Sequence, residues 1–111
     1  MTRRNIALFG GTFDPIHLGH TRVAEAASQR IEAEQVVFIP AKCSPLKGFL
    51  PNASDEDRLR MIELAIANHD RFSVHDFELR RPAPSYTLDT VKYFQQQYGA
   101  DTSLYWLLGA D

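Results

Sequence analysis

The sequence predicts an α/β fold in which helices cover a parallel β-sheet. Short apolar runs typical of buried strands alternate along the chain with longer segments whose apolar residues repeat at helical spacing. With 111 residues, of which 44% are hydrophobic and 23% charged, the chain can form one globular unit with a hydrophobic core. Each element is predicted from its own local signals.

The first strand and helix are predicted from the segment before residue 33. Residues 5–10, NIALFG, form a short apolar run that ends in a predicted glycine turn. A helix is expected over about residues 17–32, since apolar residues recur there along one stripe. The stripe contains Ile16, His20, Val23 and Ala27. His20 is therefore expected to face the sheet.

The next strand is predicted over residues 35–40, QVVFIP, a β-branched run that Pro40 closes. A long loop rich in proline and glycine follows, AKCSPLKGFLPNAS. Ser54 or Asp55 can then cap a helix over about residues 55–68. Its apolar repeat consists of Leu59, Ile62 and Ile66.

The last third of the chain predicts two further strands around one helix. Residues 71–79, RFSVHDFEL, alternate like a strand, and residues 103–111, SLYWLLGAD, form another buried strand. Between them, Ser85 or Thr87 caps a helix that ends near Tyr98 and Gly99. The large aromatic residues of this region are expected in the core or in an interface. They are Tyr93, Phe94, Tyr105 and Trp106.

Four strands separated by helices imply a Rossmann-like fold, a parallel sheet with helices on both faces. The last strand runs directly into Asp111, whereas such folds normally continue with further helices. We therefore expect residues 1–111 to be one domain, incomplete at its C-terminus, that forms the N-terminal part of a longer chain. The alternative is a small complete domain whose exposed sheet edge is covered by a partner, which leaves a homo-oligomer open.

The amino-acid composition argues against several classes of protein. Twelve Lys and Arg against fourteen Asp and Glu give a net charge of −2 and a pI near 6.0, unlike the basic surface of a dedicated nucleic-acid-binding protein. No signal-peptide pattern and no apolar run of membrane-spanning length is present, so no membrane partner is expected. Cys43 is the only cysteine, which rules out an internal disulfide. A cytoplasmic protein is expected.

The segment GGTFDPIHLGH, residues 10–20, predicts an anion site, because a strand, a glycine turn and a helix N-terminus present backbone amides and the helix dipole together. Gly10 and Gly11 allow the backbone to approach a phosphate closely. Thr12 adds a hydroxyl and an amide at the same corner. A phosphate group is the expected ligand.

His17 and His20, three positions apart, lie on one face of the first helical turn, where imidazole N–H groups can reach phosphate oxygens. Gly19 between them is costly in a helix, which calls for a close approach at that position. Two alternatives stay open: a pair that only caps the helix or is satisfied in the core, and a zinc site. The remaining candidate ligands lack metal spacing, and they are Cys43, His69 and His75.

The same segment resembles the T/H-x-G-H signature of the nucleotidyltransferase superfamily, and the whole sequence resembles the nicotinate-nucleotide adenylyltransferases. The resemblance extends in family order through FIPAKCSPLK, DRLRMIELAI, ELRRPAPSYTLDT and LLGAD. It implies the HUP-type nucleotidyltransferase fold. It also implies transfer of AMP from ATP to nicotinate mononucleotide (NaMN), giving nicotinate adenine dinucleotide and pyrophosphate, with Mg²⁺ on the ATP phosphates.

The resemblance also implies roles for individual residues. His17 and His20 would be catalytic, stabilising charge on the phosphates. The phosphates would be bound by Gly10, Gly11, Thr12, Phe13 and Lys47. Thr87 would lie near the pyridine carboxylate, where a helix N-terminus favours an anion, and Asp111 is a weaker candidate on the substrate side.

Two other matched residues, Glu78 and Arg81, are expected mainly to brace their loop. Thr87 as a plain N-cap and Lys47 as a solvated loop lysine are the alternatives for those positions.

Two departures from the family pattern affect these expectations. Leu46 replaces a histidine that is common in the family, which removes a contact in the loop. A second phosphate-binding signature, which the family has further along the chain, is absent. The alternatives to the adenylyltransferase are thus a catalytically silent nucleotide-binding fragment and a related adenylyl- or cytidylyltransferase with another phosphorylated acceptor.

Overall fold

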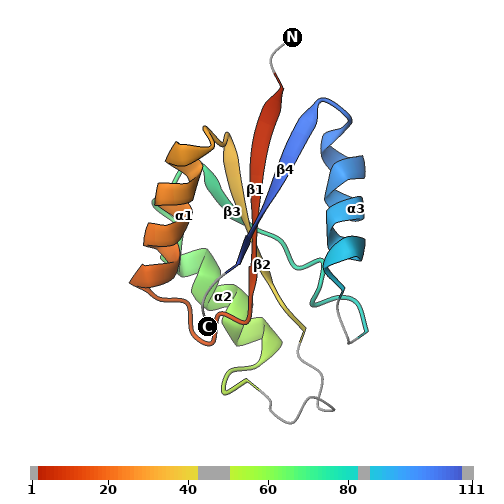
Figure 1. Ribbon diagram of the computed structural model, residues 1–111. Helices are drawn as coiled ribbons and strands as arrows, with labels where there is room; N and C mark the ends of the chain where they lie inside the picture. The colour runs from red at the N-terminus through yellow and green to blue at the C-terminus, as the bar shows by residue number, and fades with distance from the viewer. Residues whose placement is uncertain (1–2, 43–50, 83–85, 109–111) are drawn as a thin grey trace.

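The computed structural model describes residues 3–42, 51–82 and 86–108, and the α/β architecture is confirmed there. The described strands form a parallel sheet in the order β3-β2-β1-β4. They are β1 (Arg4–Gly11), β2 (Gln35–Pro40), β3 (Phe72–Val74) and β4 (Thr102–Leu108). The described helices are α1 (Leu18–Arg30), α2 (Asp55–Ala65) and α3 (Thr87–Tyr98). Each helix begins near the edge at which the strands end (Figure 1).

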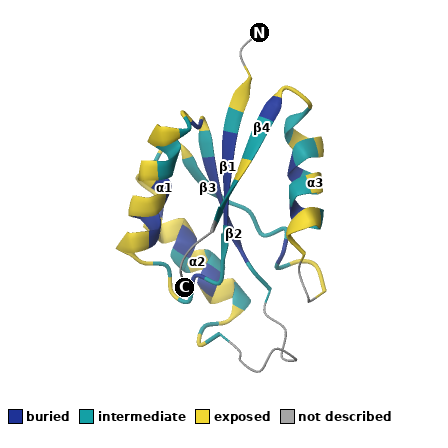
Figure 2. Cartoon of the chain, in the orientation of Figure 1, coloured by how far each residue is buried: buried dark blue, intermediate teal, exposed yellow. Residues whose placement is uncertain are grey.

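Helices lie on both faces of the sheet, as predicted, with α1 and α3 on opposite sides (Figure 1). Along β1, Ala7 and Phe9 pack toward α1 and α2, whereas Ile6 and Leu8 pack toward α3. The apolar run is continuous because both faces of the strand are buried. The centres of β1 and β2 are accordingly buried, whereas β3 is only partly buried (Figure 2).

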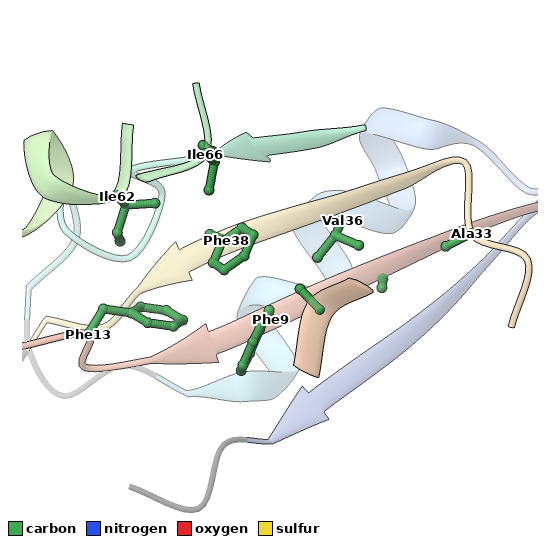
Figure 3. Close-up of a cluster of buried hydrophobic side chains, with 9 residues drawn as sticks. Phe9, Phe13, Ala33, Val36, Phe38, Ile62 and Ile66 are labelled. Atoms are coloured by element: carbon green, nitrogen blue, oxygen red, sulfur yellow. The ribbon is translucent and has the colours of Figure 1, made fainter. Parts of the chain in front are cut away.

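The core of the described part of the chain consists of two hydrophobic clusters. The one under α1 and α2 is shown in Figure 3, and its largest side chains are Phe9, Phe13, Phe38, Ile62 and Ile66. The other lies under α3, where Phe94 is only 2% exposed and packs on Ile6, Leu8, Val37 and Ile39. Tyr93 and Trp106 pack against this second cluster, which confirms the expectation for these aromatic residues. Tyr105 is 39% exposed.

Two predicted helix signals are confirmed. Ser54 caps α2, since its hydroxyl oxygen accepts the Asp57 N–H at 3.1 Å. Gly99 ends α3 at a positive φ of 92°, and its N–H donates to the Gln95 carbonyl at 2.9 Å. The predicted cap by Thr87 is wrong, because Thr87 is already helical and the N-cap is Tyr86, which makes no side-chain cap bond. Ser85 lies outside the described residues.

Several predicted boundaries differ from the structure. The strand predicted over 71–79 is only three residues long, because the chain leaves the sheet after His75, whose N–H donates to the Phe38 carbonyl, and turns at Asp76. Helix α2 ends at Ala65 rather than near residue 68. The last strand begins at Thr102 and is described to Leu108, so residues 109–111 of the prediction lie outside the described part.

The predicted stripe of α1 is partly wrong. Val23 is 48% exposed, whereas the buried residues of the helix are His20, Thr21 and Ala24. The helix starts at Leu18 and turns the face centred on His20 and Ala24 toward the sheet. The prediction that His20 faces the sheet is confirmed.

Candidate active site

The connection from β1 to α1 forms the centre of the predicted site. Gly10 and Gly11 are not the turn that the sequence predicts, since both extend β1 and pair with Ile39 and Pro40 of β2. The turn follows at residues 12–16 and contains a cis Asp14–Pro15 peptide bond. The strand, turn and helix N-terminus thus follow one another in the predicted order, and the strand ends and the helix starts one residue later than predicted.

Both glycines have packing reasons to lack a side chain. A Cβ at Gly10 would lie 2.4 Å from Cζ2 of Trp106 on the neighbouring strand β4, well inside van der Waals contact. A Cβ at Gly11 would lie 3.3 Å from the ring of Phe13. The structure thus shows a packing role for both glycines. Their contact with phosphate stays a prediction.

Phe13 has an unusual backbone conformation at the centre of the turn. Its φ is +50°, in the left-handed region that costs a residue with a side chain about 1–2 kcal/mol. The ring is 3% exposed and makes edge-on contacts with Phe9 at 5.3 Å and His20 at 4.9 Å between ring centroids. Burial of a phenylalanine ring is worth about 1.5–3 kcal/mol, enough to offset that cost.

His17 and His20 together form a capping box at the start of α1. Nδ1 of His17 accepts the Gly19 N–H at 3.1 Å, and Nδ1 of His20 accepts the His17 N–H at 3.0 Å. The two rings stack with their centroids 3.9 Å apart, His17 exposed and His20 6% exposed beside Phe9. The capping role, which the sequence left as an alternative, is present in the structure.

This network assigns the hydrogen positions of both imidazoles. A ring nitrogen that accepts a hydrogen bond carries no hydrogen, so the neutral ring must carry its hydrogen on the other nitrogen, Nε2. Capping therefore uses Nδ1 of each ring, whereas any donation to an anion would use Nε2. The two roles fall on different atoms and are compatible.

The structure shows why residue 19 is a glycine. A Cβ at this position would lie 2.8 Å from Cε1 and 2.9 Å from Nδ1 of His17. The glycine leaves room for the His17 ring to fold back over the first turn of the helix. The cost of glycine in a helix, about 1 kcal/mol, is thus associated with the placement of this imidazole.

A charged cluster that the sequence analysis missed lies beside the turn, and we call it the Arg58 cluster (Arg58, Asp55 and Lys42). The Arg58 side chain is fully buried. Its Nη1 donates to the carbonyls of Thr12 at 2.7 Å and Ala41 at 2.9 Å, and its Nη2 donates to Oδ1 of Asp55 at 2.7 Å. Lys42 Nζ donates to the other Asp55 oxygen at 3.0 Å. The cluster links the ends of β1 and β2 to α2.

The two acidic residues of this region hold different segments. Burial works against the charge of Asp55, but the hydrogen bonds and charges of Lys42 and Arg58 outweigh it and lower the pKa of that carboxyl. Asp14 accepts the backbone N–H groups of Asn52 at 2.6 Å and Ala53 at 3.0 Å. The turn after β1 is thereby tied to the segment that precedes α2.

A signal for Arg58 was present in the sequence. Residues 58, 62 and 66 recur at intervals of four, and Ile62 and Ile66 are both buried. Arg58 therefore occupies the apolar stripe of α2, where a charged residue requires a specific partner. The predicted apolar repeat also includes Leu59, which is only partly buried.

The predicted substrate-side residue Thr87 is the first residue of α3 and is exposed. It lies on the helix of the other sheet face, at the end where the strands finish (Figure 1). A cavity of about 210 Å³ lies nearby, lined by Phe77, Glu78, Arg81, Pro82, Tyr86, Asp89 and Thr90. The structure does not bring Thr87 into contact with the His17–His20 pair.

Glu78 and Arg81 brace the loop before α3, as expected. The Thr90 hydroxyl donates to Oε2 of Glu78 at 2.6 Å, and the Arg81 guanidinium lies 5.1 Å over the Phe77 ring. Burial raises the pKa of the Glu78 carboxyl, against the opposing effect of the Thr90 hydrogen bond.

Several predicted residues lie outside the part of the chain that the structure describes, namely Cys43, Leu46, Lys47 and Asp111. Among the described residues, no group of three or more His, Cys, Asp and Glu side chains is arranged to hold a metal ion. Of the helices that the structure describes, none has the length and apolar character needed to span a membrane.

Comparison with known proteins gives a consistent result. The family model described as cytidylyltransferase-like matches residues 8–111. A protein of Synechococcus sp. (strain JA-3-3Ab) named probable nicotinate-nucleotide adenylyltransferase is 45% identical over 109 residues, which cover 98% of this chain and 52% of that protein. An Aquifex aeolicus protein of the same name is 42% identical over 94% of this chain and 61% of its own length. The chain spans about half the length of most such relatives.

The fold has a solved counterpart. The structure of Plasmodium falciparum nicotinic acid mononucleotide adenylyltransferase complexed with NaAD superposes with a TM-score of 0.75 at 21% identity, over 93% of this chain and 50% of the other. At that identity the match establishes the shared fold. The family match covers nearly the whole sequence and includes the β1–α1 turn with its two histidines. The chain therefore belongs to the cytidylyltransferase-like family.

Proposed function

We propose that the full-length protein transfers the AMP group of MgATP to NaMN and releases pyrophosphate. The observation that most supports this is the β1–α1 turn, where two imidazoles whose Nδ1 atoms accept backbone N–H groups stand at the N-terminus of a helix. The names of the relatives support the choice of NaMN as acceptor.

In this reaction a phosphate oxygen of NaMN attacks the α-phosphorus of ATP. The new P–O bond forms as the bond between the α-phosphorus and the bridging oxygen breaks, and pyrophosphate leaves with that electron pair. The acceptor is already an anionic nucleophile, so no covalent enzyme intermediate is required. The protein has to align the two substrates and stabilise the charge that accumulates on the phosphates.

The residues of the turn would supply that stabilisation. His17 and His20 would donate from Nε2 to phosphate oxygens, and the backbone amides near Thr12 and Phe13 would contribute with the helix dipole. We also propose the phosphate contact of Lys47, the pyridine-carboxylate contact of Thr87 and the weaker substrate contact of Asp111, all of which rest on the family resemblance.

The metal ion belongs to the substrate in this proposal. The described residues contain no cluster that would hold a cation, and the Asp14 carboxylate is occupied by two backbone N–H groups. Mg²⁺ commonly binds to substrate phosphates and keeps most of its waters. It would enter with ATP and neutralise charge on the leaving pyrophosphate.

Pyrophosphate release by the full-length protein tests this proposal. ATP is supplied with one acceptor at a time: NaMN, its amide counterpart, phosphopantetheine or glycerol 3-phosphate. We expect the highest kcat/KM with NaMN. Higher kcat/KM with another acceptor would identify a related transferase, and ATP binding without release for any acceptor would identify a silent nucleotide-binding protein.

A further inference from the structure

The Arg58 side chain is the largest fully buried side chain among the described residues, and its contacts point toward the turn. A buried guanidinium needs hydrogen-bonding partners to offset its lost hydration. Arg58 has one carboxylate, Asp55, and that carboxylate is shared with Lys42. Its other two acceptors are main-chain carbonyls at the ends of adjacent strands, and its Nε has no acceptor among the described residues.

The bond to Thr12 fixes the orientation of one peptide group. Because a trans peptide is planar, the Thr12 carbonyl and the Phe13 N–H point in opposite directions. Since the carbonyl points at Arg58 at 2.7 Å, the N–H of Phe13 must point away from Arg58. Phe13 is also the residue with positive φ, a conformation that persists only where the surroundings determine it.

The bond to Ala41 holds a second segment at the same position. Nη1 of Arg58 donates to both the Thr12 and Ala41 carbonyls, so the turn after β1 and the segment after β2 share one donor atom. The Ala41 N–H in turn donates to the Gly11 carbonyl at 2.8 Å. Loss of the guanidinium would therefore release two segments that border the proposed phosphate site.

We propose that Arg58 is a positioning residue for phosphate binding: by holding the Thr12 and Ala41 carbonyls, it directs the Phe13 N–H toward the bound triphosphate. This rests on the proposed function. Arg58 touches no substrate and acts through the peptide between Thr12 and Phe13. Lysine cannot replace it fully, because one ammonium group cannot span three acceptors in the geometry of the planar guanidinium.

The test uses the full-length protein with Arg58→Met, which removes every donor, Arg58→Lys, which keeps the positive charge on a single amine, and Ile6→Ala as a control. Ile6 is fully buried in the core cluster under α3, a different cluster from the one that contains Phe13. Steady-state kinetics for each substrate, the affinity for a non-hydrolysable MgATP analogue and thermal denaturation are measured for each variant.

We expect Arg58→Met to lower kcat/KM for MgATP by about tenfold to a hundredfold, with weaker analogue binding and a much smaller change in the KM for NaMN. Arg58→Lys should give an intermediate value. Ile6→Ala should lower the melting temperature while the folded enzyme keeps wild-type kcat/KM.

A folded Arg58→Met variant with kcat/KM and analogue affinity within about twofold of wild type would overturn the role of Arg58 and leave the proposed function intact. If Arg58→Met does not fold, Arg58→Lys decides, because wild-type kcat/KM in that variant would also overturn it. If the wild type releases no pyrophosphate, the proposed function fails instead, and the analogue affinities alone then test Arg58.

Discussion

Replacing His17 with asparagine separates the two roles of this residue. Asparagine is among the best N-cap residues, and its Oδ1 can accept the Gly19 N–H that Nδ1 of His17 accepts at 3.1 Å. The amide is too short to place a donor where Nε2 of the imidazole lies. His17→Asn thus keeps the cap and removes the proposed phosphate donor, whereas His17→Ala removes both.

The magnitudes for the two variants differ in a way that can be measured. Loss of one preorganised donor to a phosphate lowers kcat by about 10²–10³-fold, or about 2.7–4 kcal/mol of transition-state stabilisation. Loss of an N-cap bond costs about 1 kcal/mol of folding stability. We expect both variants to lose turnover to that extent, but only His17→Ala to show a lower free energy of unfolding.

Pyrophosphate release with saturating MgATP and NaMN gives kcat, and urea denaturation gives the free energy of unfolding. His69→Asn serves as the control, because His69 packs on Phe72 and contacts Glu25 away from the turn. A His17→Asn variant with kcat close to wild type would refute the donor role and leave His17 as a helix cap only.

Four further predictions follow from the described contacts. Gly10→Ala should lower the free energy of unfolding by about 1–3 kcal/mol in urea denaturation, because its Cβ would clash with Trp106, and an unchanged value would contradict the packing. Gly19→Ala should instead displace the His17 ring and lower kcat with little loss of stability; unchanged kcat would count against the ring position. Burial raises the pKa of Glu78, so the stability that this group contributes is present below its ordinary value of 4.5 and is lost as pH rises through the raised pKa. Thermal denaturation between pH 4 and 8 should therefore show that the melting temperature of Glu78→Gln rises relative to that of wild type as pH rises. Parallel plots of melting temperature against pH for the two proteins would refute this. Burial lowers the pKa of His75, so its contribution is present above 6.5 and is lost as pH falls; His75→Asn should flatten that acid-side decline in the same scan.

The strands that line the site could be predicted from the sequence because they are buried on both faces. β2 has the predicted bounds, and β1 extends the predicted run by one residue at each end. The end of β3 could not be predicted, because the alternation of RFSVHDFEL continues beyond His75, where the chain leaves the sheet. Alternating polarity indicates which face a residue prefers but not where pairing with a neighbouring strand stops.

The site was only partly predictable because its residues combine local and long-range roles. The pattern of two glycines, Thr12 and two histidines predicts the turn from adjacent residues. The need for glycine at positions 10 and 19 arises from the positions of Trp106 and of the His17 ring, which residue spacing does not indicate. Arg58 was missed because its partners, Thr12 and Ala41, are distant in sequence and bind through main-chain carbonyls.

In the proposed function, the β1–α1 turn binds the phosphates of ATP through Nε2 of both histidines. A crystal structure of the full-length protein with a non-hydrolysable ATP analogue and Mg²⁺ would show where the triphosphate binds. We expect Nε2 of His17 and of His20 to lie within about 3.2 Å of phosphate oxygens while both Nδ1 atoms keep their backbone donors. A triphosphate bound elsewhere, or imidazoles whose Nε2 atoms donate only to protein groups in that complex, would contradict phosphate binding by the two histidines.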